Sequence, residues 1–245
     1  MAEWKLNPEY QSLNNYFGSL EAVFSQEGER ITKDRVSEVV RVEIEGERYY
    51  VKRYWDAGKG IRRYVGKPRI KREWQNMQRF KKWGIPTAEV VASGLERDSK
   101  GLFARGAMVT KEIPNTVDLS MIVANADHRL NDYNWVNSIS LQLAKATRKM
   151  HDHNFAHNDL KWRNLLVDDK NQLFFIDCPS GSFWYGYMFS FRRIKDLACL
   201  DKVAKYHLTQ TQRLRFYLQY RGRDRLNDKD KKRIRSIVRL YEGRE

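Results

Sequence analysis

The chain has 245 residues, 41% of them hydrophobic, which is enough to bury a sizeable core and argues against wholesale disorder. It has two cysteines with no disulfide or metal spacing, no signal-like apolar segment and no apolar run long enough to span a bilayer, so we expect a protein of the reducing cytoplasm. The formal net charge of +15 is concentrated in residues 52–82, with twelve Lys and Arg against two acids, and in residues 192–245, with seventeen against seven, which favours either an anionic partner or solvated helix faces.

A β-hairpin is predicted in the first quarter of the chain. Residues 36–44 and 48–55 are rich in β-branched and aromatic side chains, and they flank a tight turn that contains a glycine. Lys52 lies near the end of the second run. The pattern therefore places a lysine on a strand.

A helix is predicted over residues 68–83. Ile70, Trp74 and Met77 recur at the intervals i, i+4 and i+7, and a glycine and a proline follow directly as stop signals. Glu73 lies one helical step from Ile70 and Met77. We therefore expect its side chain to point toward the buried side of this helix.

Two further strands are predicted over residues 88–92 and 106–110. A link that contains a proline follows them, and we place a boundary between two parts of the chain near residue 112. The first part, residues 1–112, is rich in strands. The second part, residues 113–245, is rich in helices.

Helical patterns dominate the second part. Residues 133–152 place Ile139, Leu143 and Met150 on one stripe, and further helices with basic surfaces are predicted after residue 192. This order of elements predicts an α+β fold of two lobes. The first lobe would be an antiparallel sheet with one main helix, and the second lobe would be mainly helical.

The chemistry of the chain centres on a loop and a short hairpin. The loop over residues 157–164 carries Asp159 and, five residues on, Asn164, and a predicted hairpin then returns Asp177 to the same end. Oxygen ligands from Asn164 and Asp177 suit Mg²⁺, and Asp159 would accept or orient the proton of a hydroxyl nucleophile. These are the parts that phosphoryl transfer from ATP requires.

This segment resembles the catalytic loop of the protein-kinase superfamily, H-x-D-L-x-x-x-x-N followed by a metal-binding Asp. The resemblance implies a protein-kinase-like fold, in which Lys52 and Glu73 form the pair that holds the ATP phosphates. It also implies that the segment with Met108, Thr110 and Glu112 passes through the hinge and meets the adenine.

Three departures from the protein-kinase pattern argue against a regulated protein kinase. The stretch before residue 36 has only Gly28 in place of a glycine-rich loop, so phosphate binding would depend on Lys52 and other basic side chains. Asn158 replaces the arginine that pairs with a phosphorylated activation loop. Cys178, rather than Phe-Gly, follows the metal-binding Asp.

The chain is also similar to the bacterial lipopolysaccharide core kinases, which comprise WaaP/InaA-like heptose kinases and Kdo kinases, over roughly residues 36–200. The similarity lies in residues 50–54, 71–74, 113–119, 157–166 and 193–198. It implies transfer of the ATP γ-phosphate to a heptose or Kdo hydroxyl of the inner core at the cytoplasmic face of the inner membrane. It also implies that Asp196 braces the catalytic loop from below.

The charge pattern agrees with an anionic glycolipid acceptor. Basic residues that would border the cleft are Lys59, Arg62, Arg63, Lys67 and Arg69. The basic C-terminal segment would favour an anionic leaflet, where each such residue contributes about 1 kcal/mol. The aromatic residues Tyr54, Trp55 and Tyr64 either stack on sugars or pack inside the lobe. No nucleic-acid partner is expected.

Several alternatives remain open. The preferred reading is a heptose kinase, and four alternatives stand beside it. They are a Kdo kinase, a protein Ser/Thr/Tyr kinase, a small-molecule kinase of the aminoglycoside type, and an inactive kinase fold that binds through its basic surface. A metal site at His151, His153 and His157 is a further reading, and we prefer a structural role for these histidines because no cysteine accompanies them.

Overall fold

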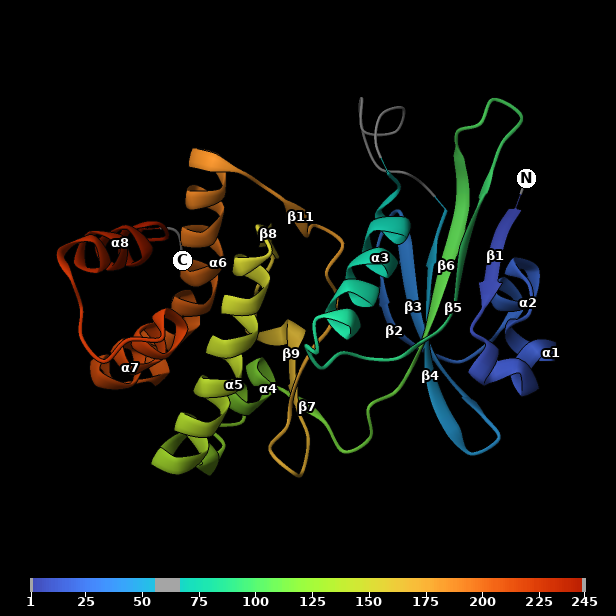
Figure 1. The fold of residues 1–245 in the computed structure, drawn as a ribbon. Helices are drawn as coiled ribbons and strands as arrows, with labels where there is room; N and C mark the ends of the chain where they lie inside the picture. Colours follow the sequence, from blue (N-terminus) through green and yellow to red (C-terminus); the bar gives the residue numbers. More distant parts are fainter. Residues whose placement is uncertain (1, 56–66, 244–245) are drawn as a thin grey trace. The chain divides into compact units, whose positions relative to one another are not determined.

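The computed structural model describes residues 2–55 and 67–243. The chain divides into two compact units, one of Met1–Lys82 with Thr87–Ile113 and one of Trp83–Pro86 with Pro114–Glu245 (Figure 1). The short segment between the helix and the next strand of the first unit thus belongs to the second unit, which the sequence did not indicate. Among the described residues, no helix combines the length and the apolar character needed to cross a membrane.

The first unit is built on a six-stranded antiparallel sheet with the order β1-β5-β6-β4-β3-β2. Its strands are β1 (Ala2–Leu6), β2 (Glu29–Lys33), β3 (Ser37–Ile44), β4 (Glu47–Tyr54), β5 (Val90–Arg97) and β6 (Phe103–Lys111). The predicted hairpin is confirmed, since β3 and β4 pair from Ile44 with Glu47 onward. Glu45 and Gly46 both adopt positive φ angles in the turn, as a two-residue hairpin requires.

Helices cover both faces of this sheet (Figure 1). They are the 3₁₀ helix η1 (Pro8–Leu13), α1 (Asn14–Phe17), α2 (Leu20–Ser25) and α3 (Arg69–Lys82). Alternate strand residues such as Val40, Val42 and Val51 form a core with Phe17 and Leu20 from the first helices. Helix α3 packs against β5 and β6, and its residues Ile70, Glu73 and Met77 are buried, which confirms the predicted helix and its buried side.

The second unit is mainly helical. Its helices are α4 (Leu119–Ala124), η3 (His128–Asn131), α5 (Tyr133–Asp152), η4 (Trp162–Asn164), α6 (Gly186–His207), α7 (Gln210–Arg221) and α8 (Asp228–Arg239). Its strands are β7 (Val117–Asp118), β8 (Phe155–Ala156), β9 (Leu165–Val167), β10 (Leu173–Phe175) and β11 (Ser182–Phe183). The helix over residues 133–152 is confirmed, whereas α6 begins earlier than the helices predicted after residue 192.

Two small sheets shape the loops of the second unit. Strands β10, β9 and β7 form one sheet, and β11 pairs with β8 in the other. The return hairpin predicted before Asp177 is the pair β9–β10, in which Leu165 lies opposite Phe175. An antiparallel sheet in the first unit and a helical second unit together confirm the predicted α+β fold.

Candidate functional site

The first group of predicted site residues lies on β4 and α3. Lys52 faces α3, because its neighbour Val51 packs into the core with the first helices on the opposite face. Its Nζ lies 2.8 Å from Oε1 of Glu73, and the Tyr54 hydroxyl donates to Oε2 at 3.2 Å. Glu73 is only 2% exposed, so its carboxylate depends on such partners. The structure thus brings Lys52 and Glu73 together.

The predicted hinge residues lie along and just beyond β6. Met108 is buried and pairs with Lys52 across the sheet, and Thr110 pairs with Tyr50. Glu112 is the only one of the three that lies beyond the strand, and its N–H donates to the carbonyl of Arg48 at 2.8 Å. Met108 and Thr110 are therefore strand residues rather than link residues, and contact with adenine stays a prediction for all three.

The loop over residues 157–164 of the second unit, which we call the catalytic-type loop, rests on Asp196 of α6. The backbone N–H groups of His157 and Asn158 each donate to its carboxylate at 2.8 Å, and Asp196 is fully buried. This geometry confirms that Asp196 braces the loop. The ring of His157 is fully buried, and this burial lowers its pKa against the opposing effect of Asp196.

The two predicted metal ligands are neighbours in the second unit. The Ile176 N–H donates to the carbonyl of Asn164 at 3.0 Å, and Asp177 follows directly. Asn164 Nδ2 donates to the carbonyl of Asp159 at 2.9 Å, and no described donor binds its Oδ1. An amide oxygen and a carboxylate are hard ligands, which Mg²⁺ takes together with water and phosphate oxygens. The residues present therefore fit a magnesium ion.

Asp159 has an ionic partner that the sequence analysis did not single out. Lys161 Nζ lies 2.7 Å from Oδ1 of Asp159, and both side chains are partly exposed. The signal was present in the sequence, as a lysine two residues after the aspartate of the loop. The contact fixes the orientation of the Asp159 carboxylate and places a positive charge beside it.

Asn158 links the catalytic-type loop to the segment that follows Asp177. Its Nδ2 donates to the carbonyls of Ala156 at 3.2 Å and Ser180 at 2.9 Å, and to Oγ of Ser182 at 3.2 Å. Its φ angle is 64°, in the left-handed region that asparagine tolerates better than most residues. In the protein-kinase pattern, the arginine at this position pairs with a phosphorylated activation loop. Here the neutral amide of Asn158 links the loop to the following segment by hydrogen bonds within the chain.

The three histidines have separate structural contacts. His151 is buried and bonds Tyr220 through Nδ1 at 2.8 Å and Asp196 through Nε2 at 3.2 Å. His153 stacks on Trp83 with 4.5 Å between ring centroids. In the described ranges, no cluster of three or more His, Cys, Asp or Glu side chains is arranged to hold a metal ion.

The structure describes only some of the first-unit residues that were expected to bind sugar or phosphate, and these differ in exposure. Lys59, Arg62, Arg63 and Tyr64 lie outside the described residues. Tyr54 is 3% exposed and bonds Glu73, so the packing alternative applies to it, whereas Trp55 is 38% exposed. Gly28 is needed for close strand approach, because a side chain there would strike the carbonyl of Arg41.

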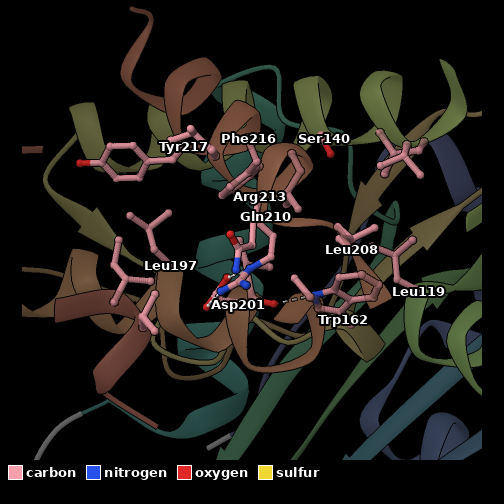
Figure 2. A pocket seen from close by; sticks show the side chains of 18 of the residues that line it. Leu119, Ser140, Trp162, Leu197, Asp201, Leu208, Gln210, Arg213, Phe216 and Tyr217 are labelled. Atoms are coloured by element: carbon pink, nitrogen blue, oxygen red, sulfur yellow. Dashed lines mark hydrogen bonds and ion pairs between the residues drawn. The ribbon is translucent and has the colours of Figure 1, made fainter. Parts of the chain in front are cut away.

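The second unit also has an apolar cavity of about 360 Å³, lined by residues of α4, η3, α5, η4, α6, α7 and α8. Figure 2 shows Leu197, Phe216 and Tyr217 among its walls, together with a charged pair. That pair is Arg213 and Asp201, joined by two hydrogen bonds of 2.7 Å. None of the predicted site residues lines this cavity, so it is a separate feature.

Three comparisons with known proteins bear on the family. The family model described as "Lipopolysaccharide kinase (Kdo/WaaP) family" matches residues 18–220. A curated protein named 3-deoxy-D-manno-octulosonic acid kinase, from Haemophilus influenzae, is 27% identical over 120 residues, which are 46% of this chain and 47% of that protein. Its namesake from Actinobacillus succinogenes is 28% identical over 120 residues, with the same two shares.

The chain thus matches about half the length of these curated relatives. A solved structure described as "WaaP in complex with acyl carrier protein" aligns with 98% of this chain and 94% of that chain at 23% identity, with a TM-score of 0.71. This likeness shows that the two proteins share a fold.

Proposed function

The chain belongs to the lipopolysaccharide kinase (Kdo/WaaP) family, and from this premise we propose that it transfers the γ-phosphate of ATP to a sugar hydroxyl of the lipopolysaccharide inner core. The observation that carries the proposal is the contact of 2.8 Å between Lys52 and Glu73. A buried carboxylate that fixes a lysine on a strand is the arrangement that presents an ammonium group to nucleotide phosphates. Lys52 would hold the phosphate oxygens, and Glu73 would hold Lys52.

The loop of the second unit supplies groups suited to the transfer itself. Asp159 would accept the proton of the acceptor hydroxyl, with Lys161 orienting its carboxylate. Asn164 and Asp177 would hold Mg²⁺, which neutralises charge on the phosphates when it is bound. Asp196 keeps the loop backbone in place through its two hydrogen bonds. These roles require positioned groups and no covalent intermediate.

For the acceptor sugar, two candidates follow from different observations. Heptose is the acceptor that the sequence resemblance favoured, and Kdo is favoured by the names of the curated relatives. Purified protein with ATP, Mg²⁺ and core oligosaccharides that carry either heptose and Kdo or Kdo alone would separate them. Mass spectrometry of the products is expected to show one added phosphate on the heptose-containing core. Phosphorylation of the core with Kdo alone would assign Kdo, and absence of phosphate from both cores would contradict the proposal.

The rival activities make different predictions in the same assay. A protein kinase would label a generic protein substrate and leave the core unlabelled. An inactive binding module would label neither substrate, and Asp159→Asn would then behave like the wild type. The presence of Lys52, Glu73, Asp159, Asn164 and Asp177 opposes the inactive module. The missing activation-segment landmarks and the two basic blocks oppose the protein kinase, so we propose the sugar kinase.

The apolar cavity of the second unit favours a second interaction, with an acyl carrier protein, the partner that accompanies WaaP in the solved structure. Its acyl chain would occupy the space lined by Leu143, Leu197 and Ile237. We expect the acylated form of a purified carrier protein to bind more tightly than the unacylated form. Ser140→Phe, which narrows the cavity, should abolish that preference. Equal binding of both forms would contradict this second proposal.

A further inference from the structure

An exposed aromatic surface precedes and begins helix α6. Five large side chains between residues 183 and 191 are exposed: Phe183 at 42%, Tyr185 at 71%, Tyr187 at 86%, Met188 at 46% and Phe191 at 42%. They make up five of the fourteen large exposed hydrophobic residues in the described ranges. Proteins seldom leave so many apolar groups together in water without a binding role.

The backbone that presents these side chains is firmly held. The N–H of Trp184 donates to the carbonyl of Asn154 at 2.9 Å, and Phe183 pairs with Phe155 across β8 and β11. Phe189, within the same segment, is buried and acts as an anchor. The exposed rings are therefore projected from a fixed scaffold, which can be followed in Figure 1 from β11 into α6.

Positive charge accompanies the rings, and negative charge is absent from the segment. Residues 183–195 contain Arg192, Arg193 and Lys195 and no acid. The guanidinium of Arg192 lies 4.3 Å from the centre of the Trp184 ring. The next acid along the chain, Asp196, is fully buried beneath the catalytic-type loop and cannot offset this charge at the surface.

The rings and the charges lie on the same side of the helix. Tyr187, Phe191 and Lys195 follow each other at intervals of four residues, and so do Met188 and Arg192. A helical stripe that begins with aromatic and apolar side chains and continues with basic ones is typical of segments that lie in the interface of an anionic bilayer.

We propose that residues 183–191, together with Arg192 and Lys195, form a surface that binds an anionic lipid bilayer. The exposed rings would enter the headgroup region, and the two basic side chains would contact lipid phosphates. The proposal rests on the proposed function, because an acceptor anchored in lipid would be presented at such a surface. The segment also follows Asp177 by only a few residues, so contact with the bilayer would occur close to the catalytic-type loop along the chain.

Vesicle binding tests this surface without nucleotide or acceptor. The full chain is sedimented with vesicles of phosphatidylcholine alone and of an equal mixture with phosphatidylglycerol. We expect binding to the mixed vesicles only, and a loss of about tenfold or more in the double variant Tyr187→Ser with Phe191→Ser. The matched control is Met121→Ser with Tyr133→Ser, which removes one methionine and one tyrosine of 49% and 53% exposure from the same unit. The control should bind like the wild type.

A second measurement reports insertion directly. Tyr187→Cys and Met121→Cys are labelled with an environment-sensitive fluorophore, since Cys178 is buried and Cys199 is partly buried. We expect a blue shift at position 187 and none at position 121 when mixed vesicles are added. The proposal is overturned if the wild type does not bind mixed vesicles or if the double variant binds as the wild type does. Failure of phosphotransfer alone would leave these readouts unaffected, so the two proposals fail separately.

Discussion

Replacement of Lys52 should separate the stability of the buried ion pair from its role with nucleotide. Glu73 is 2% exposed and the Lys52 side chain is 18% exposed, so either single substitution leaves a charge in a poorly solvated site. Breaking a buried pair in this way costs about 3–5 kcal/mol, which lowers Tm by roughly 6–20 °C for a chain of this size. We expect Lys52→Met and Glu73→Gln each to show a loss in this range.

The double variant Lys52→Met with Glu73→Gln carries no charge at either position, so it should recover much of the lost stability. It should remain inactive, because the ammonium group that would hold the phosphates is gone. Thermal melting and phosphotransfer are measured on all three variants. A double variant less stable than both single variants, or an active Lys52→Met, would refute the reasoning.

Three other predictions concern the second unit. Asn158→Ala and Asn158→Gly should each lower kcat by about tenfold. Because glycine tolerates the φ angle of 64°, a loss of activity in both variants would show that the missing hydrogen bonds, rather than backbone strain, cause it. Lys161→Met should lower kcat to a similar extent with an unchanged Tm, because its side chain is 48% exposed; full activity would remove Lys161 from the mechanism. Asp230→Asn should lower the free energy of unfolding at neutral pH by about 1.5–3 kcal/mol. Burial raises the pKa of Asp230, but hydrogen bonds from Asn227 and Tyr217 outweigh it and hold this pKa below its usual 3.8. The stabilisation by the Asp230 carboxylate is therefore complete above pH 3.8 and is lost as the pH falls through the pKa of the folded state. Urea melts that show the same difference at every pH would contradict this assignment.

Elements with a strong local pattern could be predicted from the sequence. The hairpin of β3 and β4 and the helices α3 and α5 each carry a clear period, and the structure places them within a few residues of the predicted bounds. Strand β1 could not be predicted, because its five residues are held by pairing with β5, from Ala2 with Glu96 to Leu6 with Ala92. Such a pairing leaves no signal near the strand itself.

The candidate site shows the same division. The spacing of Asp159, Asn164 and Asp177 marked the loop, because these residues are close in the chain. The contacts of Asn158 with Ser180 and Ser182 depend on the fold of the following segment, so the sequence showed only a missing arginine. The cavity draws its walls from the helices α4 to α8 and from η3 and η4, and no single stretch of sequence predicts it.

Transfer of labelled phosphate from γ-labelled ATP to purified lipopolysaccharide core, compared between the wild type and Asp159→Asn, tests the central claim most directly. The expected result is label on a core sugar with the wild type and at least a hundredfold slower labelling with the variant, as the loss of a general base usually gives about 10²–10⁴-fold. A wild type that leaves the core unlabelled, or a variant that labels it at the same rate, would contradict the account.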